Sequence, residues 1–170
     1  MKFSRMNTKK EALIKAMEAY FNSDTKRINH ARNVTEYAEQ LWQKEGGDYP
    51  IIVGAAVLHD IGIHQAEKKY GSSSGKYQEI EGPPIARNIL TELKFAAEQI
   101  EAICDIIAHH HSPGKITTKE FCVLYDADWL VNLKDEYDIR DQGKLNSIID
   151  NVFLTRSGKA LAREIYLQKS

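Results

Sequence analysis

The segment YPIIVGAAVLHDIG, residues 49–62, most constrains the fold, because hydrophobic side chains would occupy nearly every side of the helix that it predicts. Such a helix must be buried on most of its surface by other elements. The flanking segments carry hydrophobic residues at helical spacing, and no alternating pattern of useful length for a β-strand appears. The sequence therefore predicts an all-α fold, a single globular helical bundle over residues 1–170.

Capping residues and hydrophobic spacing predict where the first helices begin and end. The segment NTKKEALIKAMEAYF is expected to begin at a cap by Asn7. Its expected hydrophobic stripe contains Leu13, Ala16 and Tyr20. The next helix is expected to run from a cap by Asp24 to a stop at Gly46 and Gly47, with His30 on its buried stripe.

The second half of the chain predicts further helices. They lie in PIARNILTELK, AAEQIEAICDIIAHHH and TTKEFCVLYDADWLVNLKDEY, followed by two amphipathic segments that begin at Asp141 and Ser157. Residues 65–84, QAEKKYGSSSGKYQEIEGPP, are polar and rich in Gly and Ser. That composition is typical of a mobile surface loop with a single helical turn, either a lid or a flexible connection.

Composition excludes several classes of function. A net charge of −1 provides no basic face for a long nucleic acid, although a small anionic substrate needs only a local cluster of cations. No apolar stretch is long enough to span a membrane, and the charged segment MKFSRMNTKK is not a signal peptide, so a cytoplasmic protein is expected. Cys104 and Cys122 each lie in an apolar helical pattern, which is typical of buried free thiols.

Ionisable side chains stand at several positions where the hydrophobic pattern predicts a buried residue. These positions are His30, the pair His59 and Asp60, the run His109 to His111, and the acids Asp126 and Asp128. Each has an ordinary structural explanation. A core His can be hydrogen-bonded, imidazoles can cap carbonyls at a helix end, and an acid can lie on a surface face.

The combination favours a metal site instead. A buried carboxylate without compensation costs several kcal/mol and is usually tolerated when it is paired, hydrogen-bonded or bound to a metal. Imidazoles and carboxylates are ligands of divalent ions, and their wide separation requires a site assembled from several helices. The adjacent His59 and Asp60 fit such a site if the helix unwinds at its end, where Gly62 permits dihedral angles that other residues cannot adopt.

An isolated His, a His-Asp pair within LHDIG and a later Asp within ADWL resemble, in this order, the pattern of the HD-domain superfamily of metal-dependent phosphohydrolases. The resemblance covers roughly residues 25–135. It implies an all-α fold that binds one divalent ion, Mn, Co, Fe, Zn or Mg, and activates water against a phosphate ester. By position, the implied ligands are His30, His59, Asp60 and Asp128.

Spacing alone does not choose between the two acids of DAD, because Asp126 and Asp128 both have apolar neighbours one turn away. Superfamily members commonly read A-D-x-L here, which favours Asp128. Asn132, one turn later, resembles the Asn that follows this Asp in the branch that hydrolyses alarmone nucleotides, where it could orient the substrate. An Asn near a helix end also serves as a cap.

The resemblance to two-metal members is incomplete. Those members carry an extra His just before a Pro in the segment after HD, whereas EIEGPPIARNIL has Gly82 in that place. A single-metal site is therefore expected. The alternative is a second ion held by Glu81 or by His109 or His110.

The reaction implied by the resemblance assigns roles to several residues. The catalytic pair would be His59 and Asp60, with Asp60 as both ligand and proton acceptor. Candidate contacts to the substrate are Arg27, Lys68, His110 and Asn132. A surface position is an equally simple explanation for Arg27 and a simpler explanation for Lys68.

The expected activity is hydrolysis of a phosphate ester of a nucleotide or another small phosphorylated metabolite. The alternatives are a phosphodiesterase, an alarmone pyrophosphohydrolase and a non-catalytic nucleotide-sensing module that binds metal. Neither a nucleic acid polymer nor a membrane is an expected partner. Trp42 leaves a homodimer contact open beside the simpler role of covering a small core.

Overall fold

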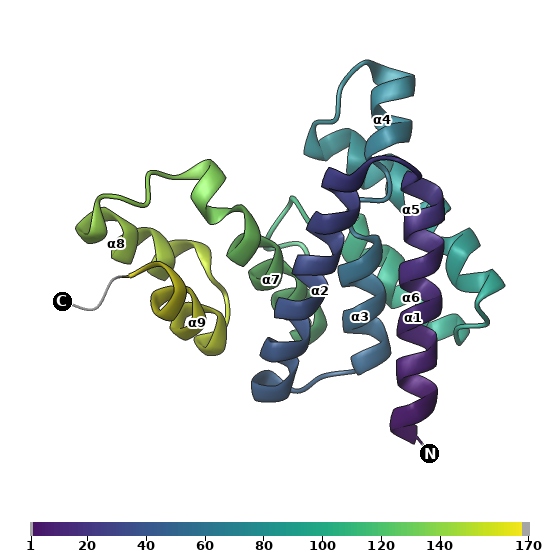
Figure 1. Ribbon diagram of the computed structural model, residues 1–170, viewed down its shortest axis with the longest axis horizontal. Helices are drawn as coiled ribbons and strands as arrows, with labels where there is room; N and C mark the ends of the chain where they lie inside the picture. Colours follow the sequence, from purple (N-terminus) through teal and green to yellow (C-terminus); the bar gives the residue numbers. More distant parts are fainter. Residues whose placement is uncertain (1, 168–170) are drawn as a thin grey trace.

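Helices form all of the regular secondary structure in residues 2–167, the part of the chain that this computed structural model describes (Figure 1). They are α1 (Lys2–Phe21), α2 (Thr25–Glu45), α3 (Tyr49–Leu58), α4 (Ile63–Tyr70), α5 (Gly75–Glu92), α6 (Ala97–Ile107), α7 (Lys119–Glu136), α8 (Gln142–Val152) and α9 (Arg156–Tyr166). Because these residues contain no strand, the predicted all-α fold is confirmed.

Helix α3 is the central helix, as its hydrophobicity predicted. Every residue from Ile52 to Leu58 is buried, and α1, α2, α6 and α7 pack around the helix. The side chain of Asp48 accepts a hydrogen bond from the N–H of Ile51 and so caps the helix. Pro50 lies in the first turn, where a missing N–H leaves no helical hydrogen bond unmade.

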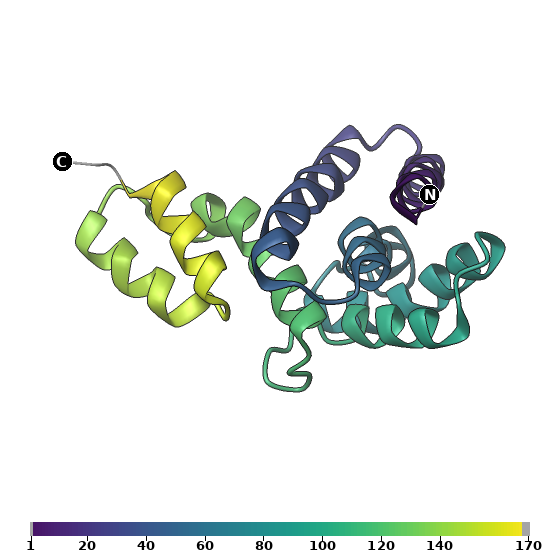
Figure 2. The same ribbon diagram turned by 90° about the horizontal axis from the view of Figure 1, so that it is seen from below.

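Helices α2 and α7 form the most extensive helix pair, and both also pack on α3. Figure 2 shows α8 and α9 as a group to one side of α1 to α6, with α7 extending between the two groups. Helix α9 packs against both α2 and α7. Residues of α7 can therefore face the central helix on one side and the C-terminal pair on the other.

The beginning of α1 differs from the prediction. The helix extends back to Lys2, so Asn7 lies inside it and is not a cap. Its buried residues are Leu13, Met17 and Phe21, whereas Tyr20 is 37% exposed. The prediction was therefore right for Leu13 and wrong for the residues that follow it. Residues three and four positions away both lie on nearly the same side of a helix, so the sequence did not show which of them is buried.

The predicted loop over residues 65–84 is wrong, because α4 and α5 include most of it and only Gly71 to Ser74 separate them. Helix α5 continues through Pro83 and Pro84. Its buried residues follow a four-residue spacing, which packs one stripe of the helix between α4 and α6; they are Gln78, Gly82, Ala86 and Leu90. Tertiary packing thus outweighs the local preference for a turn.

None of the described helices is both long and apolar enough to cross a membrane. Cys104 is buried and Cys122 is half-buried, and both thiols are free.

Candidate metal centre

The His-Asp pair lies in a tight turn that directly follows α3. The N–H of Ile61 donates to the carbonyl of Leu58, and the N–H of Ile63 donates to the carbonyl of Asp60, each at 3.1 Å. This turn brings two neighbouring side chains together, although they would diverge by about 100° on a regular helix. The Nε2 atom of His59 lies 3.4 Å from Oδ2 of Asp60.

Gly62 contributes space to this turn, not an unusual backbone angle. Its φ of −79° is available to any residue, so the expectation based on its dihedral freedom is wrong. A Cβ atom at this position would lie 2.6 Å from the backbone nitrogen of Gly82 and 2.8 Å from the carbonyl oxygen of Gln78. The glycine therefore lets α5 pack directly against the turn that carries Asp60.

Two further helices bring side chains to the same point. The Nε2 atom of His30, on α2, lies 3.2 Å from Nε2 of His59 and 3.3 Å from Oδ2 of Asp60. From α7, Oδ1 of Asp128 lies 3.0 Å from the His30 nitrogen and 3.4 Å from the His59 nitrogen. The structure thus gathers all four residues that the sequence pattern singled out.

A hydrogen bond to the backbone orients the imidazole of His59, which is fully buried. Its Nδ1 lies 2.8 Å from the carbonyl oxygen of Ala56, and because a carbonyl only accepts, Nδ1 carries the proton. The other ring nitrogen, Nε2, is thereby directed at the carboxylates. Burial alone would lower the pKa of His59, but the carboxylates of Asp60 and Asp128 raise it well above its ordinary value.

The carboxylates respond to the same neighbours. Burial would raise the pKa of Asp60, yet His59 and His110 lower it well below its usual range. The pKa of Asp128 is lowered as well, because His59 and His30 outweigh its burial. Both acids are therefore ionised and surrounded by nitrogen atoms, which makes the cluster strongly attractive to a cation.

The donor set fits a divalent ion. Atoms that share one ion at about 2.1 Å lie roughly 3.0–3.4 Å from each other when they are neighbours in its coordination shell. The five contacts among Nε2 of His30, Nε2 of His59, Oδ2 of Asp60 and Oδ1 of Asp128 lie between 3.0 and 3.4 Å. Two imidazole nitrogens and two carboxylates at these distances repel one another unless a proton or a metal ion lies among them.

A second group of imidazoles adjoins the first. His110 is buried, and its Nδ1 lies 2.7 Å from the carbonyl oxygen of Ile107, so the lone pair of Nε2 is directed inward. This Nε2 is a buried atom with no hydrogen-bond partner among the described residues, and it lies 3.5 Å from Oδ1 of Asp60. Asp60, His110 and His111 form a second set of groups close enough to hold an ion.

Gln78 orients His111 in this second group. The side-chain nitrogen of Gln78 donates to the carbonyl of Ser73 at 2.6 Å, which directs its oxygen to Nε2 of His111 at 3.0 Å. His111 must then donate through Nε2 and keep a lone pair on Nδ1. Burial and the neighbouring His110 lower the pKa of His111 to about 4, so this ring is neutral.

Asp126 is engaged elsewhere. Its oxygens accept hydrogen bonds from the N–H of Leu154 at 2.8 Å, and from the N–H at 2.8 Å and the hydroxyl at 2.6 Å of Thr155. A Cβ atom at Gly158 would lie only 2.2 Å from its Oδ2. Burial raises the pKa of Asp126 to about 6, against these hydrogen bonds, which lower it. Asp126 therefore fastens the segment between α8 and α9 to α7, on the side away from the His residues.

Comparison with models of known protein families gives a match to the HD domain over residues 27–133, which is more than half of the chain and contains all four clustered residues. The chain belongs to the HD-domain family. The HD-domain superfamily consists of metal-dependent phosphohydrolases that bind divalent ions, and the His and Asp groups described above are compatible with such an ion. No match was found among curated proteins or among solved structures.

Of the other residues predicted for the site, Asn132 is hydrogen-bonded to the cluster, whereas Arg27 and Lys68 are not. Asn132 donates to Oδ1 of Asp128 at 2.8 Å, so it orients that carboxylate. Arg27 lies one turn before His30 in α2 and is half-buried, whereas Lys68 is exposed on α4. The side chain of neither cation makes a hydrogen bond or an ion pair with the four clustered residues.

Glu81 and His109, considered as ligands of a second ion, point elsewhere. The carboxylate of Glu81 accepts hydrogen bonds from Lys69 and from the hydroxyl of Tyr70, each at 2.8 Å. His109 binds the carbonyl of Asp105 through Nδ1 at 2.9 Å. The second set beside Asp60 contains the imidazoles of His110 and His111 instead.

A cavity of about 240 Å³ opens next to the cluster. Its lining consists of His110, His111, Tyr125, Asp128, Trp129, Asn132 and Glu136. Sequence reasoning did not identify Trp129, Tyr125 or Glu136 as functional, nor Gln78. The signal for the first three was their helical spacing: each lies three or four residues from either Asp128 or Asn132 on one helix, a spacing that brings side chains together.

Proposed function

We propose that this HD domain hydrolyses the phosphate monoester of a nucleotide or of another small phosphorylated metabolite, with one divalent ion bound by His30, His59, Asp60 and Asp128. The observation that carries the proposal is the convergence of these four side chains, at 3.0–3.4 Å, beside a cavity lined by aromatic and polar groups. Mn, Co, Fe, Zn and Mg all accept such ligands.

When bound, the ion would lower the pKa of a coordinated water and polarise a phosphoryl oxygen. The residues of the chain supply the remaining functions. Asp60 presents Oδ2 to the two ligand imidazoles and Oδ1 to His110, so Oδ1 is placed to accept a proton from the attacking water. His59 keeps its lone pair on the cluster because Ala56 holds its other nitrogen. Nε2 of His110, whose lone pair faces Oδ1 of Asp60 at 3.5 Å, is placed to take up the proton that Asp60 accepts and to pass it to the leaving oxygen.

The substrate side of the proposal rests on the 240 Å³ cavity. Trp129 and Tyr125 offer aromatic faces, and their ring centroids are 6.5 Å apart. A planar nucleobase could pack there with favourable stacking. Glu136, at the edge of the same cavity, would disfavour further phosphate groups and accept hydrogen bonds from a base or a sugar. This supports a monophosphate more than an alarmone or another polyphosphate.

The alternative functions remain those of a phosphodiesterase, an alarmone pyrophosphohydrolase and a metal-binding nucleotide sensor. Asn132, which resembles an alarmone-branch residue, already donates to Asp128, so its position is explained without a substrate. A sensor would bind metal and nucleotide but release no phosphate.

The test is phosphate release from a panel of nucleoside monophosphates, sugar phosphates, diesters and alarmone nucleotides. The protein would be stripped of metal and reloaded in turn with each of the five ions, and its metal content would be measured. Asp60→Asn is the inactive variant, and Asp105→Asn is its matched control, because Asp105 is an exposed acid whose nearest partner is His109. We expect turnover of monophosphates that depends on metal and falls at least about 1000-fold in Asp60→Asn only.

Release from diesters or alarmones alone would assign one of the alternative reactions. Absence of turnover in protein with one bound ion would assign the sensing function. Equal activity in Asp60→Asn and in Asp105→Asn would refute the proposed centre.

A further inference from the structure

A second cavity, of about 550 Å³, lies at the other end of α3 from the metal centre. It is formed by α1, by the first turns of α3 and by the connection between α5 and α6. Its lining consists of Arg5, Met6, Lys9, Lys10, Leu13, Tyr49, Pro50, Val53 and Phe95. Since α3 rises about 1.5 Å per residue, His59 lies roughly 10–15 Å from this cavity along the helix axis. The two sites are therefore separate.

The floor of the cavity is hydrophobic. Leu13, Val53 and Phe95 are buried, with exposed fractions of 1%, 2% and 7%. Met6 and Pro50 extend this apolar surface to the rim. A volume of this size is within the usual range for small-molecule sites, which are mostly apolar with a few polar groups.

The rim is cationic, and none of the described residues that line the cavity is acidic. Lys10 is paired with the carboxylate of Glu39 at 2.8 Å, so its charge is compensated. Lys9 donates to the carbonyl of Lys94 at 3.4 Å, which leaves its charge uncompensated. The guanidinium of Arg5 makes no hydrogen bond or ion pair with any residue whose side chain the structure describes. Two positive charges thus remain at the mouth of an apolar cavity.

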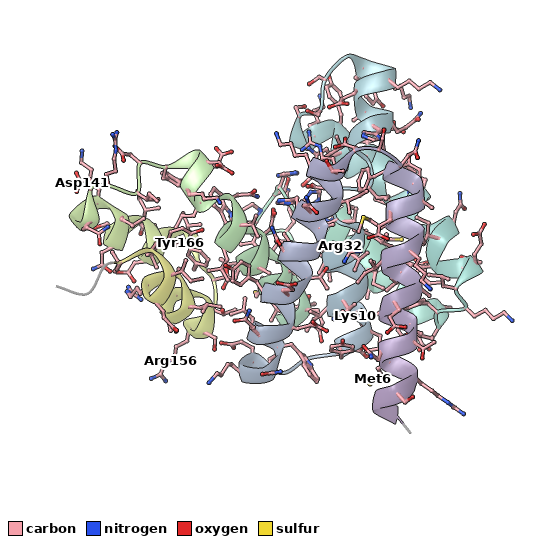
Figure 3. All side chains as sticks on the ribbon, in the orientation of Figure 1. Met6, Lys10, Arg32, Asp141, Arg156 and Tyr166 are labelled. Atoms are coloured by element: carbon pink, nitrogen blue, oxygen red, sulfur yellow. The ribbon has the colours of Figure 1, made fainter. Side chains whose placement is uncertain are left out.

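Lys9 and Lys10 hold the geometry of the rim. The Nζ atom of Lys9 lies 4.5 Å from the ring centroid of Phe95, which fixes the ammonium above the apolar floor. The carboxylate that binds Lys10 also accepts a hydrogen bond from the hydroxyl of Tyr49 at 2.6 Å. Figure 3 shows Met6 and Lys10 on the N-terminal half of α1. Helix α1 is thereby joined to α2 and α3 while a cavity is left between them.

We propose that this cavity binds a small amphipathic anion, an apolar molecule with a single carboxylate such as a medium-chain fatty acid. The apolar part would occupy the space over Leu13, Val53 and Phe95. The carboxylate would lie at the rim between Lys9 and the guanidinium of Arg5, whose two parallel N–H groups match a carboxylate. The single carboxylate compensates one of the two free charges and suits the site better than a polyanion, whose charge would exceed that of the rim.

The proposal is tested by titrating the metal-loaded full chain with decanoate in a calorimeter. We expect one site per chain with a Kd below about 1 mM. Tryptophan fluorescence gives a second signal, because the ring of Trp42 lies 4.7 Å from that of Tyr49 at the cavity wall. Decan-1-ol, which lacks the charge, and acetate, which lacks the chain, should each bind at least about tenfold more weakly.

Charge reversal at the rim is the decisive comparison. The double variant Arg5→Glu/Lys9→Glu should weaken decanoate binding at least about tenfold. Its matched control, Lys15→Glu/Lys26→Glu, changes the net charge equally at two exposed lysines outside the cavity and should alter binding less than about twofold.

Several results would overturn the proposal. One is the absence of decanoate binding at millimolar concentration, and another is equal weakening by both double variants. Decan-1-ol binding as tightly as decanoate would mean that charge plays no part. Sedimentation that shows a dimer, dissociated by Arg5→Glu/Lys9→Glu and insensitive to decanoate, would assign the cavity to a second copy of the chain instead.

Discussion

Two aspartates only two residues apart on α7 serve opposite sides of the molecule. Successive helical residues are rotated by about 100°, so Asp126 and Asp128 point in nearly opposite directions. Asp128 faces His30 and His59, whereas Asp126 accepts three hydrogen bonds from Leu154 and Thr155. The same side-chain chemistry is therefore divided between a candidate metal site and a structural junction.

Substitution at these two residues should separate the functions. Asp128→Asn removes a charged ligand, so we expect metal content to fall from about one ion per chain to under about 0.1. Asp126→Asn should keep the metal but lower the free energy of unfolding by about 1–3 kcal/mol, because a buried network loses a partner. Metal analysis and urea denaturation measure the two effects. Metal loss in Asp126→Asn alone would reverse the assignment.

A single carboxylate also joins α2 to α4. Asp24 accepts a hydrogen bond from the N–H of Arg27, which caps α2, and its Oδ2 lies 2.7 Å from Nε2 of His64. The hydrogen bond from His64, together with the cap, lowers the pKa of Asp24 below its usual value of 3.8. Because its pKa is lower in the folded state, the Asp24 carboxylate stabilises the fold at every pH above the pKa of the unfolded chain. That stabilisation is lost as the pH falls through the lower pKa of the folded state.

We therefore expect Asp24→Asn to be less stable than the unmodified protein at pH 6, with the difference shrinking toward zero below about pH 3.5. Asparagine retains the capping oxygen and replaces the oxygen that faces His64 by an amide nitrogen, so the comparison isolates the ionic contact with His64 from the cap. Urea denaturation across this pH range provides the measurement. A difference that grows as pH falls would contradict this account.

At the scale of elements, the contact between the His-Asp turn and α5 depends on two glycines that face each other. A Cβ atom at Gly62 would lie 2.6 Å from the backbone nitrogen of Gly82, and backbone cannot move aside as a flexible side chain can. Gly62→Ala should therefore destabilise the protein by at least about 1–3 kcal/mol and weaken metal binding, since Asp60 would shift with the turn.

Gly143→Ala is the matched control for this substitution. The nearest atom to a Cβ atom at Gly143 is 3.7 Å away, in the side chain of Asp141. In this helical position alanine should raise stability by up to about 1 kcal/mol. Thermal denaturation and metal titration of both variants test the argument. Equal effects would show that close packing at Gly62 is unimportant.

At the scale of the whole molecule, the proposed ligands come from α2, from the turn after α3 and from α7, which are distant in sequence. An ion bound there would link three segments of the core and stabilise only the folded state. At a free metal concentration 100 times the Kd, the free energy of unfolding increases by about 2.7 kcal/mol, which raises Tm by roughly 5–10 °C for a chain of this size. We expect a chelator to reverse this increase in Tm, and we expect metal to cause no increase in the Asp60→Asn variant.

Differential scanning calorimetry of apo and metal-loaded protein measures the shift. The Asp105→Asn variant should retain it in full, since Asp105 is exposed and lies outside the cluster. A metal-induced increase of the same size in Asp60→Asn would place the ion elsewhere in the molecule.

The sequence alone determined the class of the fold and the residues worth examining. Helical spacing of hydrophobic residues is a local property, and α3, α7 and the C-terminal helices lie close to where that spacing predicted them. The order of His30, the His-Asp pair and Asp128 is equally a property of the chain. Ionisable side chains in buried segments must be paired, hydrogen-bonded or bound to a metal, so their positions in the sequence already indicated a metal site.

Only the tertiary structure decided what each residue contacts. Helix α7 is hydrophobic on both sides, so no periodicity could distinguish the face of Asp126 from that of Asp128; the packing of α2 on one side and of residues 154–158 on the other does. Likewise, α5 forms in a segment of Gly, Ser and Pro because its buried stripe packs between α4 and α6. Contacts between distant segments set these choices, and the local preferences that a sequence displays are too weak to oppose them.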